Sequence, residues 1–300
     1  MSTHKTKFDQ PAAEIFIEDH FHAPPTELTM IADGETSQAF LFETAEGQRV
    51  MRVSSHSKDG FLKDQVAHEQ FNSIDLPIPA VLEVGEIKSG LFFAISERAP
   101  GKPIDKFSKE EIDGLMPQIF GVLDAIHATE PFGEGYGNWD LDGKGKYTSW
   151  REALIKSADE DDEETKTAPF YNDEYSNNLQ AEVLAMIDGC PEVRQLIHDD
   201  FGFNNALSDG KVITGVIDWE HAAYGDPIKD VAWLDFWDEK QGYAEAYKKH
   251  IGEIPADFTY RLTCYKLLIG LGSLGFFARS RQEESYKYAQ AIIDRIQRVA

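Results

Sequence analysis

A histidine, two aspartates and an asparagine stand at the ends of two apolar runs in the last third of the chain. The first run leads into His198 and Asp200, with Asn205 five residues after that aspartate, and the second, Val212 to Ile217, ends at Asp218. Such oxygen donors can serve phosphoryl transfer. One aspartate can accept the proton of an attacking hydroxyl, while an amide oxygen and a second aspartate hold Mg²⁺ on nucleotide phosphates. Mg²⁺ takes few protein carboxylates and completes its shell with phosphate oxygens and water, which agrees with this small set of side chains.

The order of these residues resembles a known family. His198-x-Asp200-x₄-Asn205 followed by Ile217-Asp218 is similar to the H-G-D-x₄-N and I-D-W/F motifs of the aminoglycoside phosphotransferases, a branch of the protein-kinase-like fold. Other segments extend the likeness over nearly the whole chain: Leu76 to Pro79, Tyr147 to Arg151 and Gly225 to Pro227. The resemblance implies an α+β, bilobal protein-kinase-like fold. Its small antiparallel-sheet lobe would span residues 1–98, and its larger, mostly helical lobe residues 99–300.

The resemblance also implies roles for single residues. Asp200 would be the catalytic base, and Asn205 and Asp218 would be the Mg²⁺ ligands. His198 would have a structural role, bonding the loop to the metal-binding strand. Asp226 stands directly before Pro227, which is typical of a helix start, so we expect a structural N-cap there.

The nucleotide side of the resemblance falls in the first hundred residues. Kinase-like enzymes place a lysine on the third strand, and the corresponding position here is Arg52. Arginine is always charged and can bind two phosphate oxygens at once, so the resemblance implies that Arg52 binds the phosphates. Its usual partner is an acid on the following helix. The spacing back from the Leu76-Pro77 stop favours Asp64, with Glu69 as the alternative.

Two further segments correspond to parts of a nucleotide site. The turn from Asp33 to Ser37 lies where the family's loop covers the phosphates, so backbone amides and the hydroxyl of Thr36 or Ser37 could approach them. Ser96 and Arg98 lie where the hinge backbone of the family bonds adenine. Since main-chain groups would hold the purine, ATP is the expected nucleotide and GTP is also compatible.

The implied acceptor is an aminoglycoside-type antibiotic, with hygromycin B as the first to test, and phosphorylation of one of its hydroxyls would confer resistance. Carboxylates can pair with the ammonium groups of such a cationic ligand, and an aromatic ring can stack on its sugar. The candidate substrate-binding residues near the catalytic segment are Asn204, Glu220, Asp235, Trp237 and Asp238, with Glu239 beside them.

A sheet followed by helices must position these residues. Two β-rich runs, Ala39 to Thr44 and Arg49 to Ser54, predict a hairpin. The same patterns predict a helix from Gln10, a turn at Met30 to Gly34, a helix over Phe61 to Ile74, and strands over Ala80 to Ile87 and Leu91 to Ser96. The prolines and glycine of Ala99 to Pro103 mark a hinge, after which a Ser108–Glu111 capping box opens a helix.

Composition limits the partners. The chain has 300 residues, 42% of them apolar, and 29 Lys and Arg against 53 Asp and Glu give a formal charge of −24. A core can form, but such an acid excess argues against nucleic acid or an anionic membrane as a partner and agrees with a small cationic substrate. Cys190 and Cys264 form no C-x-x-C pattern, and the N-terminus has no apolar leader. The longest apolar stretch, Tyr265 to Ala278, is too short to span a bilayer and predicts a buried helix. The cysteine usage and the N-terminal composition favour a reducing compartment, so we expect a cytoplasmic protein, with the monomer as the default.

Two alternative functions are compatible with this fold. Kinases of macrolides, homoserine, choline or fructosamine share the same motifs. A catalytically inert, nucleotide-binding pseudokinase is the second alternative, but the presence of Asp200, Asn205 and Asp218 together counts against it. A protein kinase is disfavoured, because no Ala-Pro-Glu segment follows Asp218.

Overall fold

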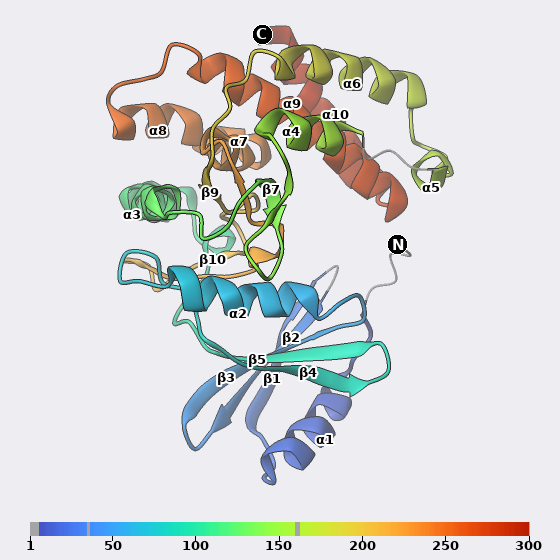
Figure 1. The fold of residues 1–300 in the computed structure, drawn as a ribbon. Coiled ribbons are helices and arrows are strands. Elements are labelled where there is room, and N and C mark those ends of the chain that lie inside the picture. Colours follow the sequence, from blue (N-terminus) through green and yellow to red (C-terminus); the bar gives the residue numbers. More distant parts are fainter. Residues whose placement is uncertain (1–5, 35–36, 160–162, 300) are drawn as a thin grey trace. The chain divides into compact units, whose positions relative to one another are not determined.

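Two compact units make up the chain. The computed structural model describes residues 6–34, 37–159 and 163–299. The first unit comprises residues 1–106 together with 204–220, and the second comprises residues 107–203 together with 221–300. Figure 1 labels many of the helices and strands of the two units.

The first unit is built on an antiparallel sheet with the strand order β1-β2-β3-β5-β4. In chain order its elements are α1 (Gln10–Phe21), β1 (Thr26–Asp33), β2 (Ser37–Thr44), β3 (Gly47–Ser54), α2 (Asp59–Phe71), β4 (Val81–Lys88) and β5 (Leu91–Glu97). The predicted hairpin is confirmed, because β2 pairs with β3 from Ser37↔Ser54 to Thr44↔Gly47. The turn predicted at Met30 to Gly34 is wrong over most of its length: β1 runs through to Asp33, because pairing with β2 supplies its hydrogen bonds.

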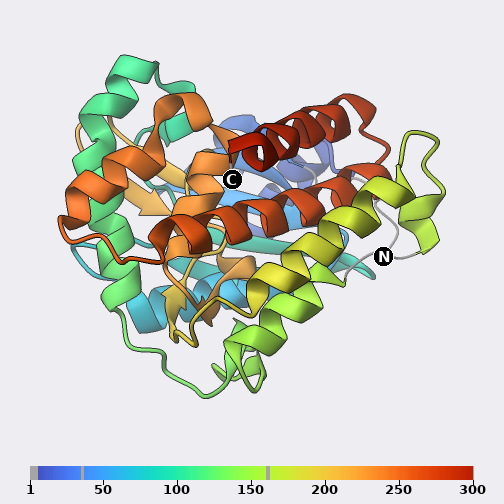
Figure 2. The same ribbon diagram turned by 90° about the horizontal axis from the view of Figure 1, so that it is seen from above.

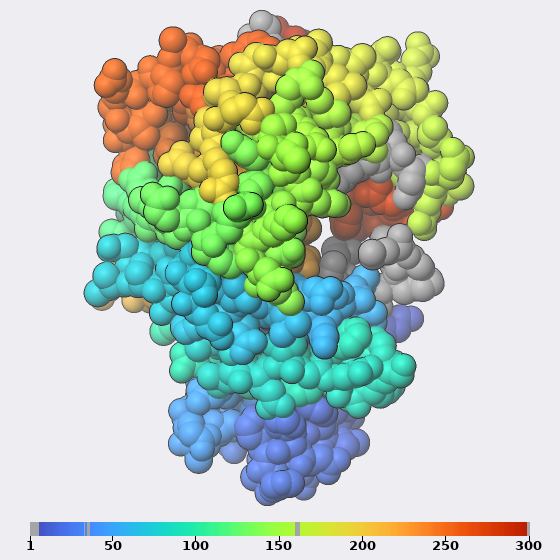
Figure 3. All heavy atoms as spheres, viewed as in Figure 1, coloured from blue at the N-terminus to red at the C-terminus, as the bar shows by residue number. Residues whose placement is uncertain are grey.

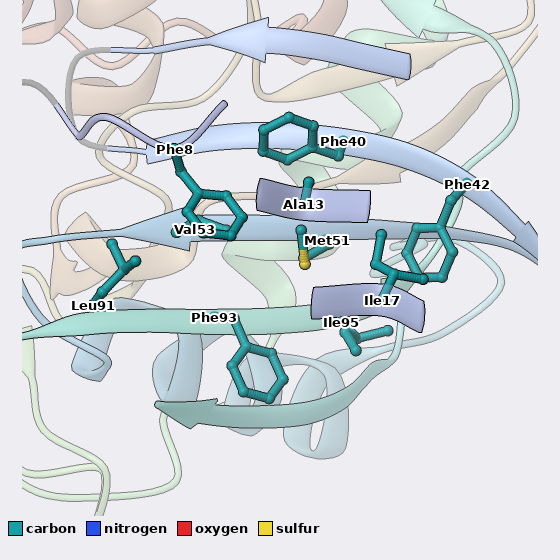
Figure 4. Close-up of a cluster of buried hydrophobic side chains, with 10 residues drawn as sticks. All are labelled: Phe8, Ala13, Ile17, Phe40, Phe42, Met51, Val53, Leu91, Phe93 and Ile95. Atoms are coloured by element: carbon teal, nitrogen blue, oxygen red, sulfur yellow. The ribbon is translucent and has the colours of Figure 1, made fainter. Parts of the chain in front are cut away.

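The side chains of β3 and β5 point alternately to the two faces of this sheet. Met51 and Val53 belong to a buried cluster with Phe93 and Ile95, and α1 covers that cluster with Ala13 and Ile17 (Figure 4). The residues between them point the other way because strand periodicity is two. Ala94 accordingly packs with Phe61 of α2, and Arg52 faces α2 as well. In the space-filling view α1 forms part of the surface of this unit (Figure 3).

A short sheet with the order β11-β10-β6 joins residues 204–220 to the first unit. Its strands are β6 (Lys102–Pro103), β10 (Ala206–Ser208) and β11 (Ile213–Val216), and the 3₁₀ turn η1 (Ile104–Lys106) follows β6. We predicted one boundary between residues 98 and 99, whereas the contacts divide the chain at 106/107 and return the 204–220 segment to the first unit. The physical reason is strand pairing across more than 100 residues of sequence, Leu207↔Pro103 and Ser208↔Lys102.

The second unit is mostly helical. Its elements are α3 (Lys109–Ala128), β7 (Tyr136–Trp139), β8 (Gly145–Tyr147), α4 (Trp150–Ala158), α5 (Glu163–Lys166), α6 (Asp173–Ile187), β9 (Gln195–Ile197), β12 (Ala223–Gly225), α7 (Ile228–Trp237), η3 (Glu239–Gln241), α8 (Tyr243–Ile251), α9 (Phe258–Arg279) and α10 (Glu283–Val299). The capping box predicted at Ser108 and Glu111 is confirmed at the start of α3. The short strands form a sheet with the order β8-β7-β12-β9.

Helix α9 is the centre of this unit and contacts α6, α7 and α10 (Figure 2). Most of its residues are buried, including the predicted apolar stretch from Tyr265 to Ala278, which explains why an apolar helix occurs in so acidic a chain. No helix among the described residues is long and apolar enough to cross a membrane.

Candidate nucleotide-binding and catalytic residues

Arg52 on β3 forms an ion pair with Asp64 on α2. The alternation along β3 directs the guanidinium toward α2, where it also lies 4.9 Å from the centre of the Phe61 ring. The sequence offered two acids as the partner of Arg52. Asp64 is buried and forms the ion pair, whereas Glu69 is exposed, so the partner is Asp64. Burial by itself would lower the pKa of Arg52, but the charges of Asp64, Asp218 and Glu220 outweigh it and raise that pKa. Arg52 therefore stays charged, and its ion pair with Asp64 and its contact with Phe61 hold it beside α2.

The second oxygen of Asp64 links α2 to the segment after β11. Its Oδ1 accepts a 2.7 Å hydrogen bond from the main-chain N–H of Trp219, while Lys63 Nζ donates to the carbonyl of Glu220 at 3.0 Å. A Cβ on Gly60 would lie 2.5 Å from Glu220 Oε2, so the start of α2 and the Glu220 side chain lie close together. The structure thus places Glu220, predicted to bind the acceptor, beside α2 within the first unit.

Asn205 and Asp218 lie at the same end of the β10–β11 pair. Ala206 is paired with Val216, and the N–H of Ile217 donates to the carbonyl of Asn205 at 2.9 Å. Asn205 is buried, and Asp218 has a φ of +68°, in the left-handed region that residues with a side chain seldom adopt. Such strain is concentrated at functional sites.

The donor chemistry of this pair fits Mg²⁺. A carboxylate and an amide oxygen are hard ligands of the kind that Mg²⁺ prefers. Among residues 6–34, 37–159 and 163–299, no cluster of three or more His, Cys, Asp or Glu side chains could hold a metal. An ion at Asn205 and Asp218 would therefore need phosphate oxygens and water to complete its shell, as Mg²⁺ on a nucleotide does.

The residues predicted to contact the rest of the nucleotide lie at strand ends. Ser37 begins β2, and its carbonyl accepts the N–H of Gly34 at 2.9 Å. Thr36 lies outside the described residues. Ser96 is buried in β5 and Arg98 follows that strand, with its guanidinium donating to Gln48. The roles of Ser37, Ser96 and Arg98 in binding stay predictions.

In the second unit, Asp230 holds the backbone that leads to Asp200. Its carboxylate accepts the N–H of His198 at 3.1 Å and the N–H of Asp199 at 2.8 Å, and His127 Nε2 lies 3.0 Å from Oδ2. Burial raises the pKa of Asp230, but the hydrogen bond and charge of His127, together with the other bonds, keep it below its ordinary value. Asp200 comes directly after this anchored segment and is partly buried.

The sequence analysis missed Asp230 and its neighbour Lys229, whose Nζ lies 2.7 Å from Asp199 Oδ2. The sequence around them, Ile228-Lys229-Asp230-Val231, gives no signal that distinguishes these two residues from polar positions on the exposed face of a helix.

The surroundings of Asp226 agree with the structural role that we expected, but the predicted N-cap is wrong by one residue: α7 begins at Ile228, and its N-cap is Pro227. One oxygen accepts the N–H of Ile228 at 3.1 Å, and the other accepts Arg261 Nη1 at 3.0 Å and the hydroxyl of Tyr265 at 2.8 Å. The side chain is fully buried, so it joins the start of α7 to α9.

The residues predicted to bind the acceptor are in different environments. Asn204 is exposed in the first unit, whereas Asp235, Trp237 and Asp238 are on or directly after α7 in the second. Asp235 is 7% exposed, and its oxygens are bonded to Lys266 Nζ at 2.8 Å and to the N–H of Ala244 at 3.0 Å. These bonds favour a structural role for Asp235.

Trp237 and Asp238 are only partly buried. Trp237 packs edge to face with Trp233, Phe236 and Phe277, and Asp238 ends α7 by donating its N–H to Leu234. Both side chains therefore keep some exposed surface that a ligand could contact.

The chain is similar to known phosphotransferases along most of its length. The model of the phosphotransferase enzyme family matches residues 27–261. Hygromycin-B 4-O-kinase of Escherichia coli is 34% identical over 281 residues, which cover 90% of this chain and 80% of that protein.

Solved structures of aminoglycoside phosphotransferases are also similar to this chain. A thermostable mutant of aminoglycoside phosphotransferase APH(4)-Ia, in a ternary complex with AMP-PNP and hygromycin B, gives a TM-score of 0.86 at 32% identity and covers 96% of this chain and 98% of that one. Aminoglycoside 2'-phosphotransferase-IIIa in complex with GDP gives a TM-score of 0.69 at 16% identity, and the match covers 96% of this chain and 98% of that one. At this identity the similarity shows only a common fold. The α+β kinase-like fold predicted from the motifs is confirmed.

Proposed function

Because this chain belongs to the phosphotransferase enzyme family, we propose that it transfers the γ-phosphoryl group of ATP to a hydroxyl of hygromycin B and so confers resistance. The observation that carries the proposal is the 34% identity with hygromycin-B 4-O-kinase along 90% of the chain. That likeness also makes the 4-hydroxyl the first position to test.

In the proposed reaction the acceptor oxygen bonds to the γ-phosphorus as the bond to the bridging oxygen of ADP breaks. Asp200 accepts the hydroxyl proton, and Arg52, held by Asp64, binds phosphate oxygens. Asn205 and Asp218 would hold Mg²⁺, which supplies positive charge to the phosphates when bound. Catalysis of this kind depends on positioning and charge, so it needs no covalent intermediate with the protein.

The remaining contacts complete the proposal. Main-chain groups at Ser96 and Arg98 would hold the purine ring of ATP, and GTP is also compatible with such contacts. Ser37 would approach the phosphates. On the acceptor side, Glu220 and Asp238 would pair with ammonium groups, Asn204 would bond hydroxyls and Trp237 would offer a ring face. Asp235 is a weaker candidate because Lys266 already neutralises it.

The charge of −24 supports a cationic acceptor, because it raises the local concentration of cations near the protein at low ionic strength. We further propose that the protein works as a monomer in the cytoplasm, where ATP is available and where its two free cysteines would stay reduced.

The decisive experiment is a coupled ADP-release assay with hygromycin B, other aminoglycosides, a macrolide and choline as acceptors. We expect the highest turnover with hygromycin B, and ³¹P–¹H NMR of the product would locate the phosphate. Asp200→Ala should abolish transfer while ATP still binds, and Glu130→Ala, a change at an exposed acid of the same unit, serves as control. Unchanged turnover of D200A would refute the mechanism, and no ADP release with any aminoglycoside would refute the substrate class.

A further inference from the structure

Asp199 occupies a backbone position that favours glycine. Its φ is +63°, in the left-handed region, and the motif that this segment resembles, H-G-D, has glycine there. Aspartate adopts the left-handed region at some cost in free energy, although this cost is smaller than for most other residues with a side chain. The chain therefore keeps a charged side chain at a strained position directly before Asp200, and the structure shows what that side chain contacts.

The carboxylate of Asp199 is paired with the ammonium of Lys229, the second residue of α7. Lys229 Nζ lies 2.6 Å from Oδ1 and 2.7 Å from Oδ2 of Asp199, and the two side chains are 10% and 19% exposed. The ammonium also lies 5.7 Å from the centre of the Trp150 ring. A pair this well enclosed has one defined geometry, unlike an ion pair at the surface.

The main chain of the same residue is fixed by the next residue of α7. Asp230 Oδ1 accepts the N–H of Asp199 at 2.8 Å, and Oδ2 accepts the N–H of His198 at 3.1 Å. Adjacent residues at the start of one helix thus hold both the side chain and the main chain of Asp199. Burial raises the pKa of Asp199 and the charge of Asp230 adds to this, whereas the charge and hydrogen bond of Lys229 act in the opposite direction.

We propose that Asp199 and Lys229 are a positioning pair for the reaction: Lys229 fixes the carboxylate of Asp199 and Asp230 fixes its N–H, and together these bonds set the direction in which the Asp200 carboxylate points. This inference rests on the proposed role of Asp200 as the catalytic base. A misplacement of about 1 Å at a reacting group can cost about 100-fold in rate, so a loosened Asp200 would lower kcat.

The test compares Asp199→Gly, Lys229→Met and the double variant with the wild type, using hygromycin B and ATP. Glycine relieves the strain at position 199, and methionine keeps the length of the lysine side chain without its charge. We expect each single change to lower kcat about 10-fold or more while KM for ATP stays within about 2-fold. Because the two residues act as one unit, the double variant should be no slower than the slower single variant.

Two additional variants separate positioning from stability. Asp199→Asn tolerates the left-handed conformation and still accepts a hydrogen bond from Lys229, so it should recover most of the activity that D199G loses. Lys240→Met, at an exposed lysine of the same unit, should match the wild type. A lower Tm with unchanged kcat in D199G and K229M would overturn the proposal, because a merely structural pair would behave in that way.

A second measurement does not depend on the substrate. Hydrogen exchange of the His198 to Asp200 amides should be faster in D199G and K229M than in K240M, and equal rates would overturn the proposal. A wild-type enzyme that is inactive toward hygromycin B would refute the proposed function instead, and the exchange rates would still decide whether this pair orders the segment.

Discussion

Removing the Asp64 carboxylate should both destabilise the first unit and weaken ATP binding. One oxygen of Asp64 pairs with Arg52, and the other accepts the N–H of Trp219 at 2.7 Å. The side chains of Asp64 and Arg52 are only 6% and 15% exposed. Asp64→Ala would therefore leave a guanidinium and a main-chain N–H without their acceptor in the interior.

The magnitude follows from this burial. Breaking one partner of a buried ion pair costs about 3–5 kcal/mol. At about 2 °C per kcal/mol for a chain of this size, Tm should fall by roughly 6–10 °C. Asp64→Asn keeps an oxygen for the Trp219 N–H and loses only the charge, so its loss of stability should be smaller. Both variants should raise KM for ATP, because Arg52 loses the group that holds it.

The matched control is Glu69→Gln, which removes a carboxylate from the same helix. Glu69 is exposed, so its loss should change the free energy of unfolding by less than about 0.5 kcal/mol. Urea unfolding at pH 7, followed by far-UV circular dichroism, measures all three variants. If E69Q lost as much stability as D64A, or if D64A matched the wild type, the assignment of Asp64 as the partner of Arg52 would be refuted.

Two further predictions concern other buried features. The pKa of Asp230 lies below its ordinary value of 3.8, so the unfolded state binds more protons near that pH; the stability that Asp230 contributes is present above about pH 4 and is lost as the pH falls below 3.8. The difference in unfolding free energy between wild type and Asp230→Asn should therefore shrink as the pH is lowered through and below 3.8, and a difference that stayed constant would contradict the assignment. Gly101 has a φ of +92°, and a Cβ there would lie 1.9 Å from the carbonyl oxygen of Ser208, so Gly101→Ala should cost more than about 2 kcal/mol in a thermal unfolding experiment. Gly90→Ala is its control, with a φ of +75° and no atom within 4 Å, and equal losses in the two variants would argue against the steric contact.

The sequence by itself determined the family, the order of the motifs and most local elements. These depend on information within a few residues: the spacing of His198, Asp200 and Asn205, the Ser108–Glu111 capping box, and the alternation that makes β2 and β3 strands. The capping box and the hairpin involve hydrogen bonds between residues close in sequence, so side-chain type and periodicity are enough to predict them.

Only the tertiary structure decided contacts between distant residues. It chose Asp64 over Glu69 through a bond to Trp219, 155 residues away, and it paired Asp235, a predicted ligand, with Lys266. Periodicity predicts which face of an element is apolar but not which element covers it.

The start of α7 shows this difference most clearly. The residues Lys229 and Asp230 look like ordinary polar positions of a helix, yet they hold the side chain and the main chain of Asp199 from 30 and 31 residues away. A buried charge is stable only where donors or an opposite charge meet it, and those partners are known only once the chain has folded. The sequence therefore determined which residues can perform the chemistry, and the folded chain decided which residues hold them in place.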